Sequence, residues 1–157
     1  MTSVSHKIQE WVPPKEGQYK ANCGVSMDRV ERRIGFGIVI RDHNGNVMAS
    51  CSLSMEASLC LRAANITAVL RSINFCMDCG LTPCSFELDE TNIIKWIVNG
   101  NFRELDVGPI LKDIDSLSSR CCWDMKFNHV DKKNNSVANG LTKLAIESSD
   151  DIYWMED

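Results

Sequence analysis

The sequence predicts one α/β domain, with a five-stranded mixed sheet that begins as a three-strand antiparallel meander and is flanked by helices. Three observations predict this class. Apolar and polar residues alternate through about residue 53, as in half-buried strands. An Asn-Gly pair at 44–45 is typical of a tight hairpin turn. From about residue 58, apolar residues recur at helical spacing instead. The 157 residues suit a single domain of this kind.

The first three strands are expected at about 19–26, 34–41 and 47–53. Their apolar residues recur every second position, which places those residues on one face. The charged stretch from Asp28 to Arg33 separates the first two strands and is expected to be a solvated loop. In the second strand, Gly35 and Gly37 occupy the other face, where another element can pack close to the backbone.

The rest of the chain alternates helices and strands. A helix is expected from 58 to 80, with Ile66, Leu70, Ile73 and Met77 on one face and Gly80 ending it. A short strand at 85–89 and a helix at 91–99 follow, the latter ending at Gly100. Another helix begins near Pro109, since proline suits a first helical position. A fifth strand is expected at 121–130, and Asn134 or Asn135 is expected to cap a last helix.

Charge and composition limit the functional classes. The hydrophobic content of 44% and the charged content of 24% are ordinary for a globular domain. Residues 147–157 hold five acids and no Lys or Arg, so subtracting their charge from the total of −4 leaves +1 for residues 1–146. A nearly neutral body is not the marked basic stripe of a strong nucleic-acid binder. We expect a lead-in at 1–18, the folded domain at 19–147 and an acidic tail at 148–157.

Location is predicted from two absences in the sequence. No apolar run is long enough to cross a bilayer, so no membrane contact is expected. Polar residues from Met1 to Trp11 stand where a signal peptide would need an apolar stretch. An intracellular protein is predicted, and nothing favours the nucleus over the cytoplasm.

The eight cysteines allow two interpretations. The first is a set of reduced thiols, most of them buried as small apolar side chains. The second is a zinc site formed by Cys76, Cys79 and Cys84 with Cys121 or Cys122. The last pair lacks metal-ligand spacing and the first two residues lie in the last turn of an expected helix, so the first interpretation is preferred.

Several short motifs occur together in a characteristic order. They are Trp11-Val-Pro-Pro14, Lys20-Ala-Asn22, Gly35-Phe-Gly37-Ile-Val-Ile-Arg41-Asp42-His-Asn-Gly45, Phe86-Glu-Leu-Asp89 and Phe127-Asn-His-Val130, followed by Asn134, Val137, Ala138, Leu141, Leu144 and Ala145. In this order and spacing, they resemble the ribonuclease H fold, and in particular the reverse-transcriptase-associated ribonuclease H-like domains abundant in plant genomes. The resemblance spans nearly the whole chain, and it implies a retroelement-derived domain.

The resemblance also implies where metal ligands would lie. Active members hold two magnesium ions with four carboxylates. The matching positions here are Gly24, Asn65, Asp89 and Asn139, so one of the four acids remains. Two dications ~4 Å apart repel by roughly 15–20 kcal/mol at an effective dielectric of about 20, and one carboxylate cannot offset that repulsion. Glu87, on the same strand face as Asp89, could lend a second charge.

The expected function is therefore a catalytically inactive ribonuclease H-like domain that binds nucleic acid (an RNA/DNA hybrid or RNA) through backbone contacts. No cofactor is expected, although the family uses Mg²⁺. Candidate phosphate contacts form two groups, one in the loop after the first strand and one before the last helix. They are Arg29, Arg32 and Arg33 in the first group, and Lys132 and Lys133 in the second, which Lys143 could join.

Two other functions are left open by the sequence. The neutral body and the acidic tail favour a protein-interaction module or a retroelement remnant without a nucleic-acid role. A residual hybrid ribonuclease that uses Mn²⁺ through Asp89 and Glu87 is the third hypothesis. A structural role for Asp89, as a cap for the helix that starts near Thr91, is an alternative to any metal role.

Overall fold

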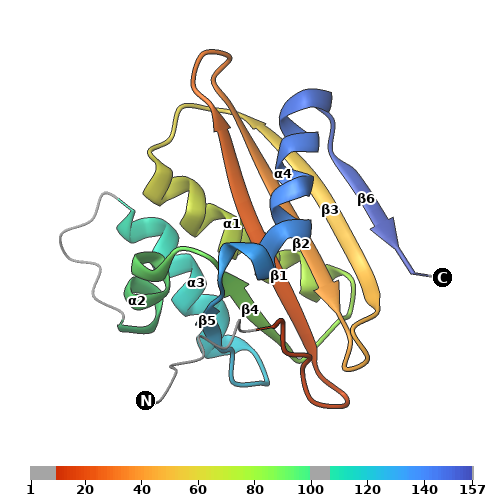
Figure 1. The fold of residues 1–157 in the computed structure, drawn as a ribbon. Coiled ribbons are helices and arrows are strands. Elements are labelled where there is room, and N and C mark those ends of the chain that lie inside the picture. Colours follow the sequence, from red (N-terminus) through yellow and green to blue (C-terminus); the bar gives the residue numbers. More distant parts are fainter. Residues whose placement is uncertain (1–9, 100–106, 157) are drawn as a thin grey trace, which may run out of the picture.

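The computed structural model describes residues 10–99 and 107–156 as a mixed sheet with helices on both faces (Figure 1). Within these residues the sheet has six strands in the order β5-β4-β1-β2-β3-β6. The elements are β1 (Tyr19–Asp28), β2 (Arg33–Arg41), β3 (Val47–Glu56), α1 (Leu61–Asp78), β4 (Cys84–Leu88), α2 (Thr91–Asn99), α3 (Gly108–Arg120), β5 (Phe127–His129), a 3-10 turn η1 (Lys132–Asn135), α4 (Ser136–Ser148) and β6 (Ile152–Met155). The predicted fold class and the opening meander β1-β2-β3 are confirmed.

The alternation along the strands explains the layers. Ala21, Cys23 and Ile38 are fully buried on the face covered by α1, while the polar residues between them face α4. The helices α1, α2 and α3 lie on one side of the sheet, and α4 crosses the other side (Figure 1). Because β4 pairs in parallel with the first half of β1, with Glu87 opposite Asn22, the C-terminal end of β4 lies beside the middle of β1. No helix among the described residues is long and apolar enough to cross a bilayer.

The predicted close approach at Gly35 and Gly37 is confirmed, and the element that approaches is α4. A Cβ on Gly37 would lie 2.0 Å from the carbonyl oxygen of Ala138, and one on Gly35 would lie 2.3 Å from that of Thr142. A strand residue beside these glycines also contacts α4. The hydroxyl of Ser26 is 2.6 Å from that of Thr142, so α4 is held directly on the backbone of the central strands.

The β2–β3 turn differs in detail from the expected tight turn. Gly45 has a positive φ of 81°. Asn44 is not among the described residues with positive φ, which a two-residue turn of the expected type would require. Instead, the carboxylate of Asp42 accepts hydrogen bonds of 2.9 Å from the backbone N–H groups of Asn44 and Asn46. The pairing register shifts after Ile40, which accommodates the longer turn.

The prediction of five strands was one strand short. Residues Ile152–Met155, in the segment predicted as an acidic tail, pair with β3 as strand β6. The fifth strand is shorter than 121–130 and covers Phe127–His129, because the residues before it form bends.

The helix boundaries agree closely with those expected. Ile66 and Ile73 of α1 are buried as predicted, whereas Met77 is 41% exposed. Gly80 follows α1 with a φ of 69°, and Pro109 lies in the first turn of α3. The described part of α2 matches 91–99, while its predicted end at Gly100 and the lead-in residues 1–9 lie outside the described residues.

Candidate functional site

Three of the four positions predicted from the metal-binding pattern meet at one place. Gly24 lies in β1, Asp89 directly follows the neighbouring parallel strand β4, and Asn139 lies in the first turns of α4. The side-chain N–H of Asn139 donates a 3.1 Å hydrogen bond to Oδ2 of Asp89. A Cβ on Gly24 would lie 2.4 Å from Oδ1 of Asn139, so the asparagine fills the space beside the glycine.

The fourth position, Asn65, is buried in α1 with 4% of its surface exposed. Its side-chain N–H donates to the carbonyl oxygen of Leu61, one turn earlier in the same helix, at 3.0 Å. Among the described residues, no hydrogen bond joins it to Asp89 or Asn139. The side chain therefore stabilises its own helix, as a short polar residue inside a helix often does.

A second set of amides extends this cluster into the sheet. Asn135 is 1% exposed, and its Nδ2 donates to the carbonyl oxygen of Cys23 at 2.8 Å and to Oδ2 of Asp89 at 3.5 Å. Asn22 donates to Oδ1 of Asn135 at 3.2 Å and to Oε1 of Glu87 at 3.1 Å. The amide cluster, as we call Asn22, Asn135 and Asn139 together, thus links both nearby carboxylates.

The predicted cap of α4 is confirmed in position but not in its hydrogen bond, and the alternative role of Asp89 as a cap of α2 is not supported. Asn135 occupies the N-cap position of α4, but it makes no side-chain capping hydrogen bond because its amide points into the cluster. The side-chain hydrogen bonds of Asp89 within the described residues go to Asn135 and Asn139, not to the start of α2. Asn22 and Asn135 were not predicted as site residues, although the first belongs to the Lys20-x-Asn22 motif.

Glu87 is engaged on the far side of the cluster. Its carboxylate lies 3.4 Å from Nζ of Lys20, which also lies 5.5 Å from the centre of the Trp11 ring. The indole N–H of Trp11 donates to Oδ1 of Asn22 at 3.1 Å. The lead-in residue Trp11 therefore covers the amide cluster on its outer side. The guanidinium of Arg41 lies over the same ring, with its central carbon 5.1 Å from the ring centre.

These residues do not fit a pair of magnesium ions. Oxygens of Asp89 and Glu87 already accept hydrogen bonds from neutral amides or face Lys20. Within the described residues, no group of three or more His, Cys, Asp or Glu side chains could hold a metal ion. Mg²⁺ favours charged oxygen ligands and dehydrates reluctantly. A carboxylate that already accepts hydrogen bonds from asparagine side chains is therefore a poor ligand for it.

The cysteines give little support to the zinc interpretation. A hydrogen bond with Cys76 raises the pKa of the Cys84 thiol well above its usual range, and burial adds to the effect. Burial likewise raises the pKa of Cys79. Because zinc binds the thiolate, a thiol that resists deprotonation is a poor ligand.

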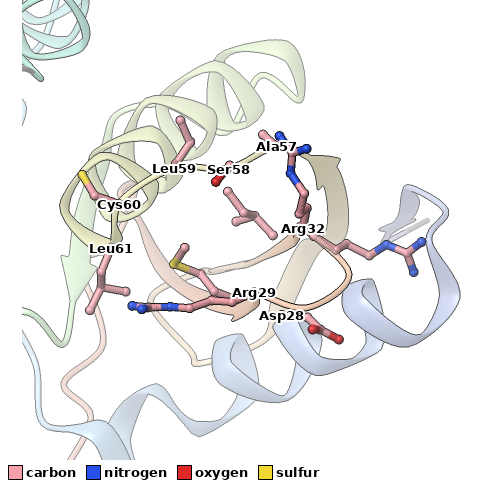
Figure 2. Close-up of a pocket in the computed structure, with 11 residues that line it drawn as sticks. Asp28, Arg29, Arg32, Ala57, Ser58, Leu59, Cys60 and Leu61 are labelled. Atoms are coloured by element: carbon pink, nitrogen blue, oxygen red, sulfur yellow. The ribbon is translucent and has the colours of Figure 1, made fainter.

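The predicted basic groups are arranged differently from the expectation. Arg29, Arg32 and Arg33 line a pocket between the β1–β2 turn and the loop that leads into α1. Figure 2 shows Arg29 directed toward Leu61 and Arg32 toward Ala57, from opposite sides of this pocket. Lys143 shares a second surface hollow with Arg29 on the other side of the turn. It therefore belongs with the arginines.

The remaining basic residues mark the other end of α4. Lys132 and Lys133 are exposed on η1, directly before the buried Asn135. Arg33 is tied to the C-terminal part of α4, because its Nη1 donates to the carbonyl oxygen of Ile146 at 3.0 Å. Basic side chains thus lie at both ends of the helix that also carries Asn139.

The topology and the site position define the ribonuclease H fold. The structure of ribonuclease H1 from a compost metagenome, LC11-RNase H1, matches with a TM-score of 0.75 at 17% identity, covering 84% of this chain and 97% of that chain. The enzyme from the halophilic archaeon Halobacterium salinarum gives 0.75 at 16% identity, with 83% and 98% covered. A foamy viral protease-reverse transcriptase in complex with RNA/DNA hybrid gives 0.64 at 15% identity, covering 92% of this chain and 22% of that chain.

The family follows from the sequence match. The model of the reverse transcriptase-like family matches residues 22–145, and the chain belongs to that family. No protein of curated function matches the sequence.

Proposed function

We propose that this chain is a ribonuclease H-like module that binds an RNA/DNA hybrid or RNA through phosphate contacts and does not cleave it. The observation that carries the proposal is the hydrogen bond to Asp89 from Asn139, which stands where the family pattern has its fourth acid. Solved structures of the same fold, LC11-RNase H1 and a foamy viral protease-reverse transcriptase, are complexes with RNA/DNA hybrid. This chain would bind such a hybrid in the same way but would lack metal-dependent cleavage.

Electrostatics supports the loss of cleavage. A two-metal mechanism needs several negative side chains to hold two dications close together. Here the amide N–H of Asn139 donates to the remaining carboxylate of Asp89, and the oxygen of the same amide occupies the space beside Gly24. Binding a dication would require displacing these hydrogen bonds without gaining the charge that offsets ion–ion repulsion.

The basic residues provide a track for a sugar–phosphate backbone. Helix α4 has 13 residues, so its two ends lie roughly 20 Å apart. Lys132 and Lys133 lie at the N-terminal end, while Lys143 and Arg29 lie toward the other end. Contacts at both ends would recognise the shape and the charge of the sugar–phosphate backbone, without sequence-specific contacts to the bases.

The first experiment measures binding of a labelled RNA/DNA hybrid over a salt series with Mg²⁺ present, and analyses the end point on a denaturing gel. We expect affinity that falls steeply with salt, because phosphate contacts release counterions, and an intact substrate. Absence of binding at low salt would contradict the proposal and shift the role to a protein partner. Cleavage that is lost in Asp89→Asn would instead establish a residual nuclease.

A reconstruction tests the assignment of the site positions. The variant Gly24→Asp, Asn65→Glu and Asn139→Asp restores all four carboxylates. A Cβ at position 24 would lie 2.4 Å from Oδ1 of Asn139 and 3.5 Å from its backbone nitrogen. The side chain at position 139 keeps its size in the Asp replacement, so it must rotate to admit the new carboxylate. We expect Mg²⁺-dependent hybrid cleavage, and none when Asp89→Asn is added. A folded but inactive triple variant would refute the assignment.

A further inference from the structure

Strand β6 forms one edge of the sheet, and its outer side is open within the described part of the chain. The backbone N–H of Glu156 donates to the carbonyl oxygen of Met48 at 2.9 Å. In the antiparallel register of β3 and β6, this bond fixes which residues point inward. Ile152 and Trp154 face β3 with their backbone groups, so those of Tyr153 and Met155 face outward and can pair with another strand.

The side chains of β6 are apolar and largely exposed. Tyr153 is 58% exposed, Trp154 is 41% exposed and Met155 is 54% exposed. Tyr153 is anchored on the α1 side, where its ring centre lies 6.0 Å from that of Phe75. A strand of aromatic residues with free outward hydrogen-bonding groups is the usual acceptor for strand addition, in which main-chain bonds supply affinity.

Charge determines what kind of strand can pair there. Acidic residues flank the strand on both sides: Asp150 and Asp151 before it, and Glu156 and Asp157 after it. A second copy pairing antiparallel would bring these acids against one another, which is unfavourable. A nucleic acid would be repelled for the same reason. A segment rich in Lys or Arg would gain attraction at both ends.

We propose that β6 docks an extended, basic segment of a protein partner by strand addition. Backbone groups of Tyr153 and Met155 pair with the added strand, and its alternate apolar side chains pack against Trp154 on one face and Tyr153 on the other. The flanking acids select Lys and Arg at the ends of the segment. This surface uses the outward hydrogen-bonding groups of an edge strand, whereas the basic residues of the proposed nucleic-acid site lie on α4, on η1 and in the β1–β2 turn (Figure 1).

The test uses two labelled peptides of alternating sequence, one of Lys and Val and one of Glu and Val, with binding followed by fluorescence anisotropy. The intact protein should bind the Lys peptide and not the Glu peptide. The variant Asp150→Lys with Glu156→Lys should bind the Lys peptide about tenfold or more weakly and should gain binding of the Glu peptide. Amide exchange at Tyr153 and Met155 should slow when the peptide is bound.

The matched control carries the same charge change elsewhere. Asp113→Lys with Asp115→Lys alters exposed residues of α3, on the opposite side of the molecule from β6 (Figure 1), and should leave Lys-peptide affinity unchanged. Equal loss in both variants, or equal binding of both peptides, would overturn the proposal. A dimer formed through β6 in sedimentation would also overturn it, because a second copy would then be the occupant.

Discussion

At the scale of single residues, the absence of a side chain at Gly35 and Gly37 decides how α4 sits. The carbonyl oxygen of Ala138 would lie 2.0 Å from a Cβ at position 37, which no real contact permits. The opposing atoms are backbone, so relief requires moving the whole helix. Since α4 carries Asn139 and follows Asn135, the glycines also position the amide cluster.

Replacing Gly37 with Ala should therefore destabilise the protein. We expect the free energy of unfolding to fall by about 3 kcal/mol in urea denaturation, as for other overpacked sites. Gly140→Ala is the matched control within α4. A Cβ there meets nothing within 4 Å, so we expect a gain of about 0.5–1 kcal/mol from the lower flexibility of the unfolded chain. An unchanged stability of Gly37→Ala would contradict the packing described.

At the scale of elements, the β2–β3 hairpin is closed by Asp42. Desolvation raises the pKa of the Asp42 carboxyl, but hydrogen bonds from Asn46 and Asn44 outweigh it and hold the pKa below its ordinary value of 3.8. A depressed folded-state pKa means that the charged form stabilises the folded protein. This stabilisation is complete above the unfolded pKa and is lost as the pH falls through the folded value.

Asp42→Asn should lower the urea midpoint at neutral pH, because the amide loses the charge that strengthens these bonds. The difference from the unmodified protein should shrink when the pH is lowered to about 2, below the ordinary pKa. Asp113→Asn, on the exposed face of α3, controls for the removal of one surface charge. A difference that persists unchanged at acidic pH would show that the charge of Asp42 has no part in closing the turn.

At the scale of the whole molecule, charge is divided between different elements of the fold. Basic residues lie along α4 and the β1–β2 turn, while acidic residues flank β6 at the sheet edge. The net charge of −4 conceals this division. Two ligands of opposite charge can therefore be accommodated, a nucleic acid at the basic surface and a basic protein segment at β6.

The double variant Arg29→Ala with Lys143→Ala tests the basic surface. Hybrid affinity should fall, and the slope of log affinity against log salt should decrease by about one for each phosphate contact removed. Lys112→Ala, an exposed lysine on α3, should change neither quantity. Equal slopes for the double variant and the unmodified protein would place the phosphate contacts elsewhere.

Local patterns in the sequence predicted most of the fold. Alternation gave β1, β2 and β3, because strand periodicity depends only on neighbouring residues. Pro109 and Gly80 marked helix ends through their own backbone preferences. The shorter β5 was mispredicted, since apolar residues before Phe127 pack on the core without forming a strand.

The sequence by itself determined the fold class and most of the helices, and it predicted that three acids of the family pattern are replaced. Only the tertiary structure decided that Asn22 and Asn135, 113 residues apart, share a hydrogen bond beside Glu87. It also decided that Lys143 lies with Arg29, and that the acidic end of the chain pairs with β3. The physical reason is the same in each case: helix and strand periodicity is local, whereas side-chain networks and strand pairing depend on distant parts of the chain being brought together.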